Sequence, residues 1–198
     1  MFAAVLDTSV LWPSLQRDLL LSLAAERTYR PLWSTAILDE LVYHEAQKLI
    51  GRGEESAGAS QRAARLIGEM TRAFDDALVT DWEPLEGTYG LPDPDDEHVV
   101  AAAVVGRAEV IVTSNLSDFP GGLLPENVRA ISPQEFVNDT VRHHLTRACR
   151  AVLEICDRSG RFGTKLEVAD VLSALERRYR MFEAVEVLSG APELRDYL

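Results

Sequence analysis

Residues 109–118 read EVIVTSNLSD, an apolar run of β-branched side chains that ends in a polar turn. Valine and isoleucine favour extended strands, so this run is the clearest strand in the sequence. The segment Phe2–Leu6 is a second apolar run of this kind, and it stops at the carboxylate of Asp7. Shorter strands are predicted within residues 29–33, 77–80 and 128–131.

Apolar residues at helical spacing fill the intervals between these strands. The predicted helices cover residues 12–25, a segment capped by Ser34 or Thr35 that runs to Leu49, residues 66–78 and residues 99–105. The small and polar stretch 51–60 predicts a loop. Strands that alternate with helices predict a parallel sheet covered on both faces. We therefore expect an α/β protein with a three-layer α/β/α domain and a central parallel sheet.

The composition is that of a folded protein, with 198 residues, 46% of them hydrophobic and 26% charged. No apolar stretch reaches the roughly 18 residues of a membrane span, and the N-terminus has no secretion leader. We therefore expect a cytoplasmic protein with no membrane partner. The two cysteines, Cys149 and Cys156, stand two helical turns apart, which is too far for a disulfide, so we expect buried free thiols.

The character of the sequence changes at Ser132. The segment Ser132-Pro-Gln-Glu135 is a capping box with proline at the first helical position, and helical periodicity continues to about Cys156. A loop at 159–163 and a second capping box, Thr164-Lys-Leu-Glu167, predict another helix. We expect a domain at residues 1–137 and a helical C-terminal extension at 138–198 that adds no strand.

Carboxylates are crowded at the start of one predicted helix, where residues 92–103 read PDPDDEHVVAAA. Two prolines keep the approach extended, so the helix should begin just after them. One or two acidic residues would complement the helix dipole, and four exceed that need. The formal net charge of −12 opposes binding to nucleic acid, because affinity for phosphates comes from lysine and arginine. That objection weakens if clustered carboxylates hold divalent cations.

Ligands of parallel α/β sheets bind outside the carboxyl ends of the strands. Asp7 and Asp118 follow two predicted strands, and Glu40 and Asp96 lie in the first turns of two predicted helices, so four carboxylates should face one cavity. Their repulsion requires a bound cation or protons. Oxygen ligands without cysteine or a histidine trio select Mg²⁺ or Mn²⁺, ions that serve phosphoryl chemistry.

Four segments of the chain, in their order and spacing, resemble the motifs of PIN-domain ribonucleases. They are Leu6-Asp7-Thr8-Ser9, Ile37-Leu38-Asp39-Glu40-Leu41, Asp96-Glu-His-Val-Val-Ala-Ala-Ala103 and Val112-Thr-Ser-Asn-Leu-Ser-Asp118-Phe119. The resemblance covers residues 2 to about 137. It implies an endoribonuclease site dependent on Mg²⁺ or Mn²⁺, as in VapC-type toxins of toxin–antitoxin pairs, with RNA as substrate and a cognate antitoxin protein as partner.

The resemblance also implies roles for individual residues. Asp7, Glu40, Asp96 and Asp118 match the family's acidic positions. Asp7 and Asp96 are expected to bind the metal directly, Glu40 to bind it or orient a water, and Asp118 to support a second metal or its waters. Thr8 and Asn115 match polar positions that orient carboxylates or phosphate.

Several alternatives stay open at this point. Asp95 could replace Asp96 as ligand, and His98 is expected to be packed in the core rather than to act as a general base. The C-terminal helices could bind an antitoxin, form a homodimer or cover the cleft, and Arg142, Arg147 and Arg150 form either a solvated stripe or a contact surface. A non-catalytic PIN-like scaffold and a phosphatase working through Asp7 are the competing functions. The phosphatase needs a second aspartate where Ser9 stands.

Overall fold

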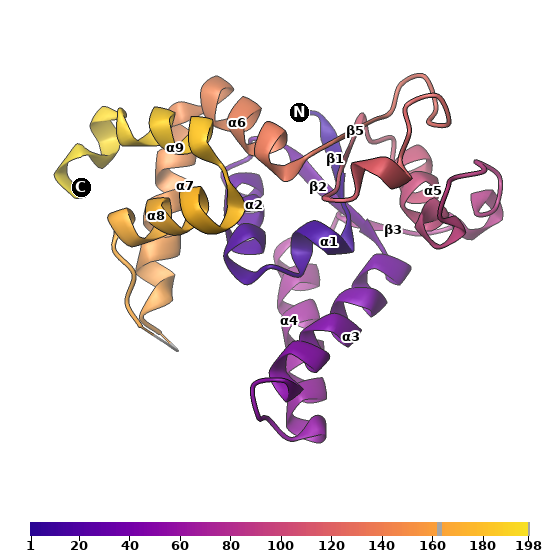
Figure 1. The fold of residues 1–198 in the computed structure, drawn as a ribbon, viewed down its shortest axis with the longest axis horizontal. Coiled ribbons are helices and arrows are strands. Elements are labelled where there is room, and N and C mark those ends of the chain that lie inside the picture. The colour runs from indigo at the N-terminus through magenta and orange to yellow at the C-terminus, as the bar shows by residue number, and fades with distance from the viewer. Residues whose placement is uncertain (162–163, 198) are drawn as a thin grey trace. The chain divides into compact units, whose positions relative to one another are not determined.

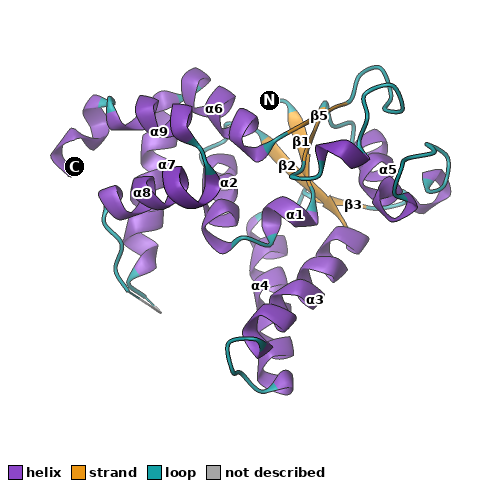
Figure 2. Cartoon of the chain, in the orientation of Figure 1, coloured by secondary structure: helices purple, strands orange, loops and turns teal. Residues whose placement is uncertain are grey.

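The computed structural model describes residues 1–161 and 164–197 of the chain. These residues form two compact units, which Figure 1 traces by residue number. The sheet unit comprises residues 2–12 and 30–131, and the helical unit comprises Met1, residues 13–29 and the chain from Ser132 onward. Figure 2 shows that the strands lie in the sheet unit.

The sheet has five parallel strands in the order β3-β2-β1-β4-β5. Their bounds are β1 Ala3–Leu6, β2 Arg30–Ser34, β3 Leu78–Val79, β4 Val110–Val112 and β5 Arg129–Ile131. Leu6 pairs with Val112, so β1 and β4 end at the same level. The two central strands have nearly no exposed side-chain surface, as expected for a parallel sheet with both faces covered. The predicted parallel sheet is confirmed.

The order of the strands reverses between β1 and β4. The chain moves outward from β1 to β2 and β3, and it then returns through α5 (Glu97–Val105) to β4 on the other side of β1. Right-handed crossovers place α3 (Thr35–Ile50) and α4 (Ser56–Ala73) on the face opposite α5, which gives the three-layer α/β/α arrangement. The crevice at such a reversal is where ligands bind in open α/β sheets.

Two helix starts determine where acidic side chains emerge. The hydroxyl of Ser34, the last residue of β2, accepts a hydrogen bond from the Ile37 amide at 3.2 Å, so α3 follows the strand without a loop. At α5, the Asp93 carboxylate accepts a bond from the Asp95 amide at 3.0 Å, and a 3₁₀ turn, Pro94–Asp96, leads into the helix. The helix begins at Glu97, two residues before the predicted start at Val99.

Glu97 connects this helix to the preceding loop. Its carboxylate accepts hydrogen bonds from the amides of Tyr89 at 3.1 Å, Gly90 at 2.7 Å and Leu91 at 3.2 Å. These donors, Tyr89 first among them, lower the pKa of Glu97 below its usual value. The side chain is only 3% exposed, so it supports the loop and is unavailable as a ligand.

The helical unit contains α2 (Ser14–Ala25), α6 (Pro133–His143), α7 (Leu145–Ser159), α8 (Val168–Tyr179) and α9 (Phe182–Ser189). Helix α2 packs on α7, and α6 packs on α9. Cys149 and Cys156 are buried and free on α7, as predicted, and burial raises the pKa of both thiols, that of Cys149 to about 11. None of the described residues beyond 138 forms a strand, as predicted.

Three predicted boundaries were wrong. The helix from Ser132 breaks at His144, whose φ of −136° and ψ of 45° are not helical, so α6 and α7 are separate. The capping box of α8 is formed by Glu167 and Asp170, not by Thr164 and Glu167. The predicted loop 51–60 ends early because α4 begins at Ser56, and that helix ends at Ala73.

The division into units groups the chain from Ser132 onward with α2, and the proposed domain boundary at 137/138 stays a prediction. Phe162 and Gly163 of the predicted 159–163 loop lie outside the described residues. Among the described helices, none is both long enough and apolar enough to cross a membrane.

Candidate active site

Asp7 is the first residue after β1, and it is held by both central strands. Its amide donates to the Val112 carbonyl at 3.1 Å, which continues the ladder between β1 and β4. Its carboxylate atom Oδ2 accepts hydrogen bonds from Ser9 Oγ at 2.5 Å and Thr113 Oγ1 at 2.7 Å. The side chain therefore has a fixed orientation, and Oδ1 is the oxygen left for a ligand.

Glu40 lies in the second turn of α3, and both of its carboxylate oxygens have partners. Thr8 Oγ1 donates to Oε2 at 2.6 Å, and His98 Nε2 lies 3.1 Å from Oε1. Burial acts against ionisation, but the hydrogen bonds from His98 and Thr8 outweigh it and lower the pKa of Glu40. Glu40 is therefore ionised at neutral pH and oriented from two sides.

His98 packs inside the sheet unit, as expected, with its ring beside that of Trp82 at 6.0 Å between centroids. Burial opposes its protonation, but the hydrogen bond to Glu40 and the charges of Glu40 and Asp7 raise the pKa of His98. A carboxylate can only accept, so Nε2 carries the proton. Nδ1 is buried and has no partner among the described residues, which makes His98 a support for Glu40 rather than a solvent-facing base.

Asp96 ends the 3₁₀ turn before α5, and its environment shows that the carboxylates are close together. Burial and the charges of Asp7 and Asp118, followed by that of Asp93, raise the pKa of Asp96 to about 6. The neighbouring Asp95, which was the alternative ligand, is exposed and is not among the residues that line the cavity. The geometry therefore favours Asp96 over Asp95.

The turn after β4 brings in two further predicted residues. The backbone N–H of Asn115 donates to Thr113 Oγ1 at 3.0 Å. Asn115 also lines the same cavity as Asp7 and Asp96. Asp118 ends the 3₁₀ turn Leu116–Asp118 and does not line the cavity, although its charge acts on Asp96. Asp118 is therefore more distant from the cavity than the other predicted acidic residues.

These side chains surround a cavity of about 380 Å³. It is lined by Asp7, Thr8, Ser9, Trp12, Glu40, His44, Asp96 and Asn115. Sequence reasoning missed Ser9, Trp12 and His44 as site residues. A signal for two of them was present, because Trp12 and His44 each stand four residues after a predicted site residue and so share its helical face.

The donor set fits a hard divalent cation, although no complete set of protein ligands is formed. Among the described residues, no three His, Cys, Asp or Glu side chains are arranged to hold a metal ion. Mg²⁺ commonly binds through one or two carboxylates and keeps several waters. Asp7 and Asp96 supply two such carboxylates, and the repulsion that raises the pKa of Asp96 is what a cation would relieve.

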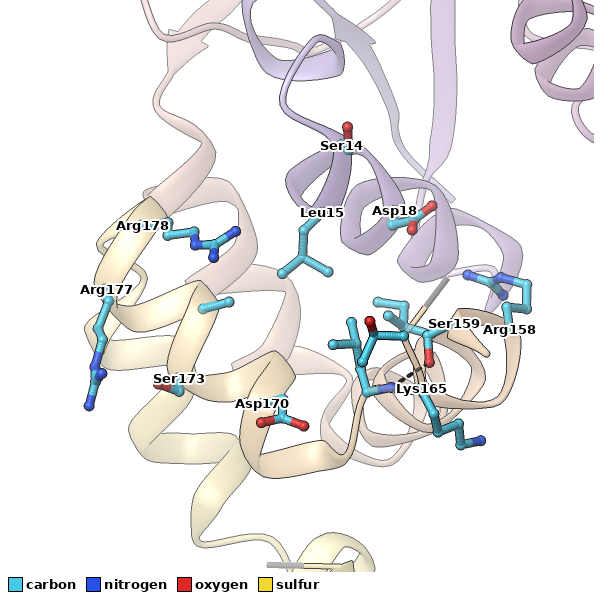
Figure 3. A pocket seen from close by; sticks show the side chains of 14 residues that line it. Ser14, Leu15, Asp18, Arg158, Ser159, Lys165, Asp170, Ser173, Arg177 and Arg178 are labelled. Carbon is cyan, nitrogen blue, oxygen red and sulfur yellow. Dashed lines mark hydrogen bonds between the residues drawn. The ribbon is translucent and has the colours of Figure 1, made fainter. Parts of the chain in front are cut away.

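A larger cavity, of about 740 Å³, lies in the helical unit between α2, α7 and α8 (Figure 3). It contains two carboxylates, Asp18 and Asp170, together with cationic side chains that include Arg158 and Arg178. Arg158 also donates to Ser22 Oγ at 2.7 Å. Since its acidic groups stand among cations, this cavity is a poor candidate for a metal site despite its size.

The three arginines of the predicted stripe make contacts within the helical unit. Arg142 Nε donates to Asn138 Oδ1 at 3.0 Å, Arg147 donates to the carbonyl of Arg27 at 2.9 Å, and Arg150 pairs with Glu26 at 3.1 Å. All three arginine side chains are nevertheless exposed, so the solvated stripe and the contact surface both stay predictions.

A five-stranded parallel sheet with carboxylates at the reversal of strand order defines an α/β domain with a candidate ligand site, and comparison with known proteins names its family. The chain matches the family described as PIN domain over residues 3–117, and it belongs to that family. It is also 53% identical over 45 residues to a Mycobacterium tuberculosis (strain ATCC 25618 / H37Rv) protein named "Putative ribonuclease VapC50". That alignment covers 22% of this chain and 27% of the relative. No solved structure matches the chain.

Proposed function

We propose that the protein is a metal-dependent endoribonuclease of the VapC type, which hydrolyses phosphodiester bonds of RNA as the toxin of a toxin–antitoxin pair. The observation that carries this proposal is the convergence of Asp7 and Asp96 on one cavity at the reversal of strand order. Membership of the PIN-domain family and the name of the partial relative support it.

Mg²⁺ or Mn²⁺ bound by Asp7 and Asp96 would supply a water of lowered pKa and would stabilise negative charge on the phosphate. Ser9 and Thr113 hold Asp7 in place for this task through Oδ2. Glu40, kept ionised by Thr8 and His98, would orient the attacking water and accept its proton. Asp118 adds negative charge that strengthens cation binding.

Asn115 completes the proposed site on the side of the turn after β4. It lines the cavity and is exposed, so its amide nitrogen can donate to a phosphate oxygen. Neutralisation of the carboxylates by cations removes the main electrostatic obstacle to RNA for a chain with a net charge of −12. Single-stranded RNA is the expected substrate, with an antitoxin protein as the expected regulator.

The partners of the helical unit belong to the same proposal. An antitoxin or a second copy of this chain would bind there, because α8 and α9 carry exposed side chains such as Arg177, Arg178 and Phe182. Arg177 and Arg178 have no ion-pair partner among the described residues, unlike Arg150 and Arg158 of α7.

One observation favours a second candidate, a PIN-like scaffold that binds protein or RNA without cutting it. This observation is the lack of a complete set of protein metal ligands among the described residues. The two functions differ in their response to metal, because a catalytic site must bind the cation in a saturable manner and a scaffold need not.

The deciding experiment combines Mn²⁺ titration with cleavage of single-stranded RNA by the purified full chain. The nuclease is expected to bind Mn²⁺ saturably and to cut RNA only in the presence of Mg²⁺ or Mn²⁺. Asp96→Asn should lose both properties, and the matched control Asp95→Asn should keep both. RNA binding without metal binding or cleavage would support the scaffold and refute the nuclease.

A further inference from the structure

The three tryptophans of the chain have very different environments. Trp33 is fully buried and Trp82 is 6% exposed, as expected for large aromatic side chains in a core. Trp12 is 43% exposed, and it forms part of the lining of the cavity that contains Asp7 and Asp96. The proposed mechanism gives this indole no task.

The exposed indole is nevertheless held in place. Trp12 Nε1 donates to the carbonyl of His44 at 3.3 Å, which connects the end of α1 (Thr8–Leu11) to α3. Lys48 Nζ donates to the carbonyl of Trp12 at 3.2 Å and lies 5.8 Å from the centroid of its ring. A side chain that is ordered before a ligand arrives loses little conformational entropy on binding.

Two further rings, those of His44 and Tyr43, lie next to Trp12 or to its neighbour. His44 lines the same cavity, and the ring of Tyr43, which is 61% exposed, stands edge-on to it at 5.3 Å between centroids. Lys48 pairs with Glu45, so its charge is largely compensated, and its effect here is to steady the indole. The lining of the cavity therefore includes aromatic rings, Trp12 and His44, as well as carboxylates.

Flat aromatic faces beside a site for phosphate chemistry suit a nucleobase. Base stacking on an aromatic side chain needs no hydrogen-bond readout and is common among proteins that bind single strands. We infer that Trp12, steadied by His44 and Lys48, forms a nucleobase subsite where one base of single-stranded RNA stacks next to the phosphate at Asp7 and Asp96. This inference rests on the proposed nuclease function.

The subsite has consequences for the choice of substrate. A base can stack only when it is unpaired, so the enzyme should cut single strands and loops in preference to duplexes. Stacking tolerates every base, so Trp12 should add affinity and position the strand without demanding one nucleotide.

The test measures kcat/KM for a short single-stranded RNA and for the same RNA with one base removed at each position in turn. For the wild-type enzyme, removal of one base next to the cut should lower kcat/KM about tenfold. Trp12→Ala should lower kcat/KM for the intact RNA by a similar factor and should abolish the sensitivity to that abasic position. Trp12→Phe should retain most of both properties.

Two controls separate stacking from a general loss of structure. Tyr197→Ala removes an exposed aromatic ring of the helical unit and should leave cleavage unchanged. Thermal unfolding of Trp12→Phe, the conservative variant, should match that of the wild type. Undiminished kcat/KM in Trp12→Ala, or abasic sensitivity that persists in that variant, would overturn the subsite while leaving the nuclease function intact.

A wild-type protein that cuts no RNA would refute the proposed function, and the subsite is then tested by binding. The fluorescence of Trp12 is obtained as the difference between the wild type and Trp12→Phe, because Trp33 and Trp82 are buried in both. Saturable quenching of this signal by the same RNA would support a base-stacking surface, and its absence would overturn it.

Discussion

The candidate site of the sheet unit and the helical unit differ in how their acidic side chains are compensated. In the helical unit, carboxylates meet cations, as in the pairs Arg150–Glu26 at 3.1 Å and Arg158–Glu154 at 3.8 Å. In the candidate site, the charges of Asp7 and Asp118 act on Asp96, and no ion pair among the described residues includes any of the three, whereas other carboxylates of the sheet unit, such as Glu45, have cationic partners.

This difference helps to identify the acidic residues that form a ligand-binding site. Like charges that folding brings together lower the stability of the folded protein. A cluster of carboxylates without cationic partners therefore indicates a functional site. The cavity of the helical unit is the larger, yet its charges are mixed in sign. Charge imbalance is therefore a better guide to the candidate site than cavity size.

The largest expected effect comes from removing a carboxylate of the uncompensated cluster. Asp7→Asn should lower RNA cleavage at least about 100-fold, because a metal site contributes several kcal/mol to transition-state stabilisation. Asp18→Asn, which removes a carboxylate of the helical cavity, should change the rate less than about twofold. Cleavage assays with Mn²⁺ measure the rates of both variants. Equal losses of rate would contradict the assignment of the site to the carboxylates of the sheet unit.

Binding of Mn²⁺ should raise the free energy of unfolding. At a Mn²⁺ concentration about 100 times Kd, the gain is about 2.7 kcal/mol, which corresponds to roughly 5–10 °C in Tm for a chain of this size. Differential scanning fluorimetry measures the shift. Asp96→Asn should lose it and Asp170→Asn should keep it, and a shift that survives in Asp96→Asn would place the metal elsewhere.

The hydroxyl groups around Asp7 should contribute less. Ser9→Ala removes one of two hydrogen bonds to Oδ2 and leaves that from Thr113, so cleavage should fall about tenfold, in keeping with the roughly 1.5 kcal/mol of a bond to a charged acceptor. Ser9→Thr keeps a hydroxyl and should restore part of the activity. A loss as large as that of Asp7→Asn would show that Ser9 does more than hold Asp7.

The smallest effect concerns the pH dependence of stability without metal. The pKa of Asp96 is about 6 in the folded protein, against an ordinary value of 3.8. Above pH 6, Asp96 is ionised in the folded and in the unfolded protein, and its repulsion by the other carboxylates is fully present in the folded one. Between pH 6 and 4, Asp96 takes up a proton in the folded protein only, so the folded protein gains stability. Asp96→Asn should therefore stabilise the metal-free protein at pH 7.5 but not at pH 4.

The gain at pH 7.5 should be below about 1 kcal/mol, because solvent screens a carboxylate that is only partly buried. Urea unfolding in EDTA at both pH values measures it. Asp95→Asn is the matched control, since Asp95 is exposed and outside the cavity. A gain that is the same at both pH values would mean that charge repulsion is not its cause.

Much of the sheet unit was predictable because its signals are local. Short apolar runs predict strands, and polar residues at their ends predict the edge where Asp7 and Asn115 emerge. Periodicity predicted the helices but not their ends. The break at His144 was missed because apolar spacing continues across it, and only the backbone angles of that residue separate α6 from α7.

The remaining site residues depend on tertiary structure. Spacing places Trp12 four residues after Thr8, but it does not show that Trp12 is exposed while the two core tryptophans are buried, because exposure depends on what packs against each ring. His98 was correctly expected to be packed, but its contact with Glu40 joins residues 58 apart and could not be predicted from spacing. The distance of Asp118 from the cavity likewise depends on the path of the turn after β4.

The position of Glu97 beside Asp96 links the loop before α5 to the proposed chemistry. Three consecutive loop amides donate to Glu97, so these hydrogen bonds join the loop to the start of the helix. A change in loop length would therefore shift Asp96 even though the loop itself supplies no ligand. The three hydrogen bonds therefore make the loop a part of what positions Asp96 in the candidate site.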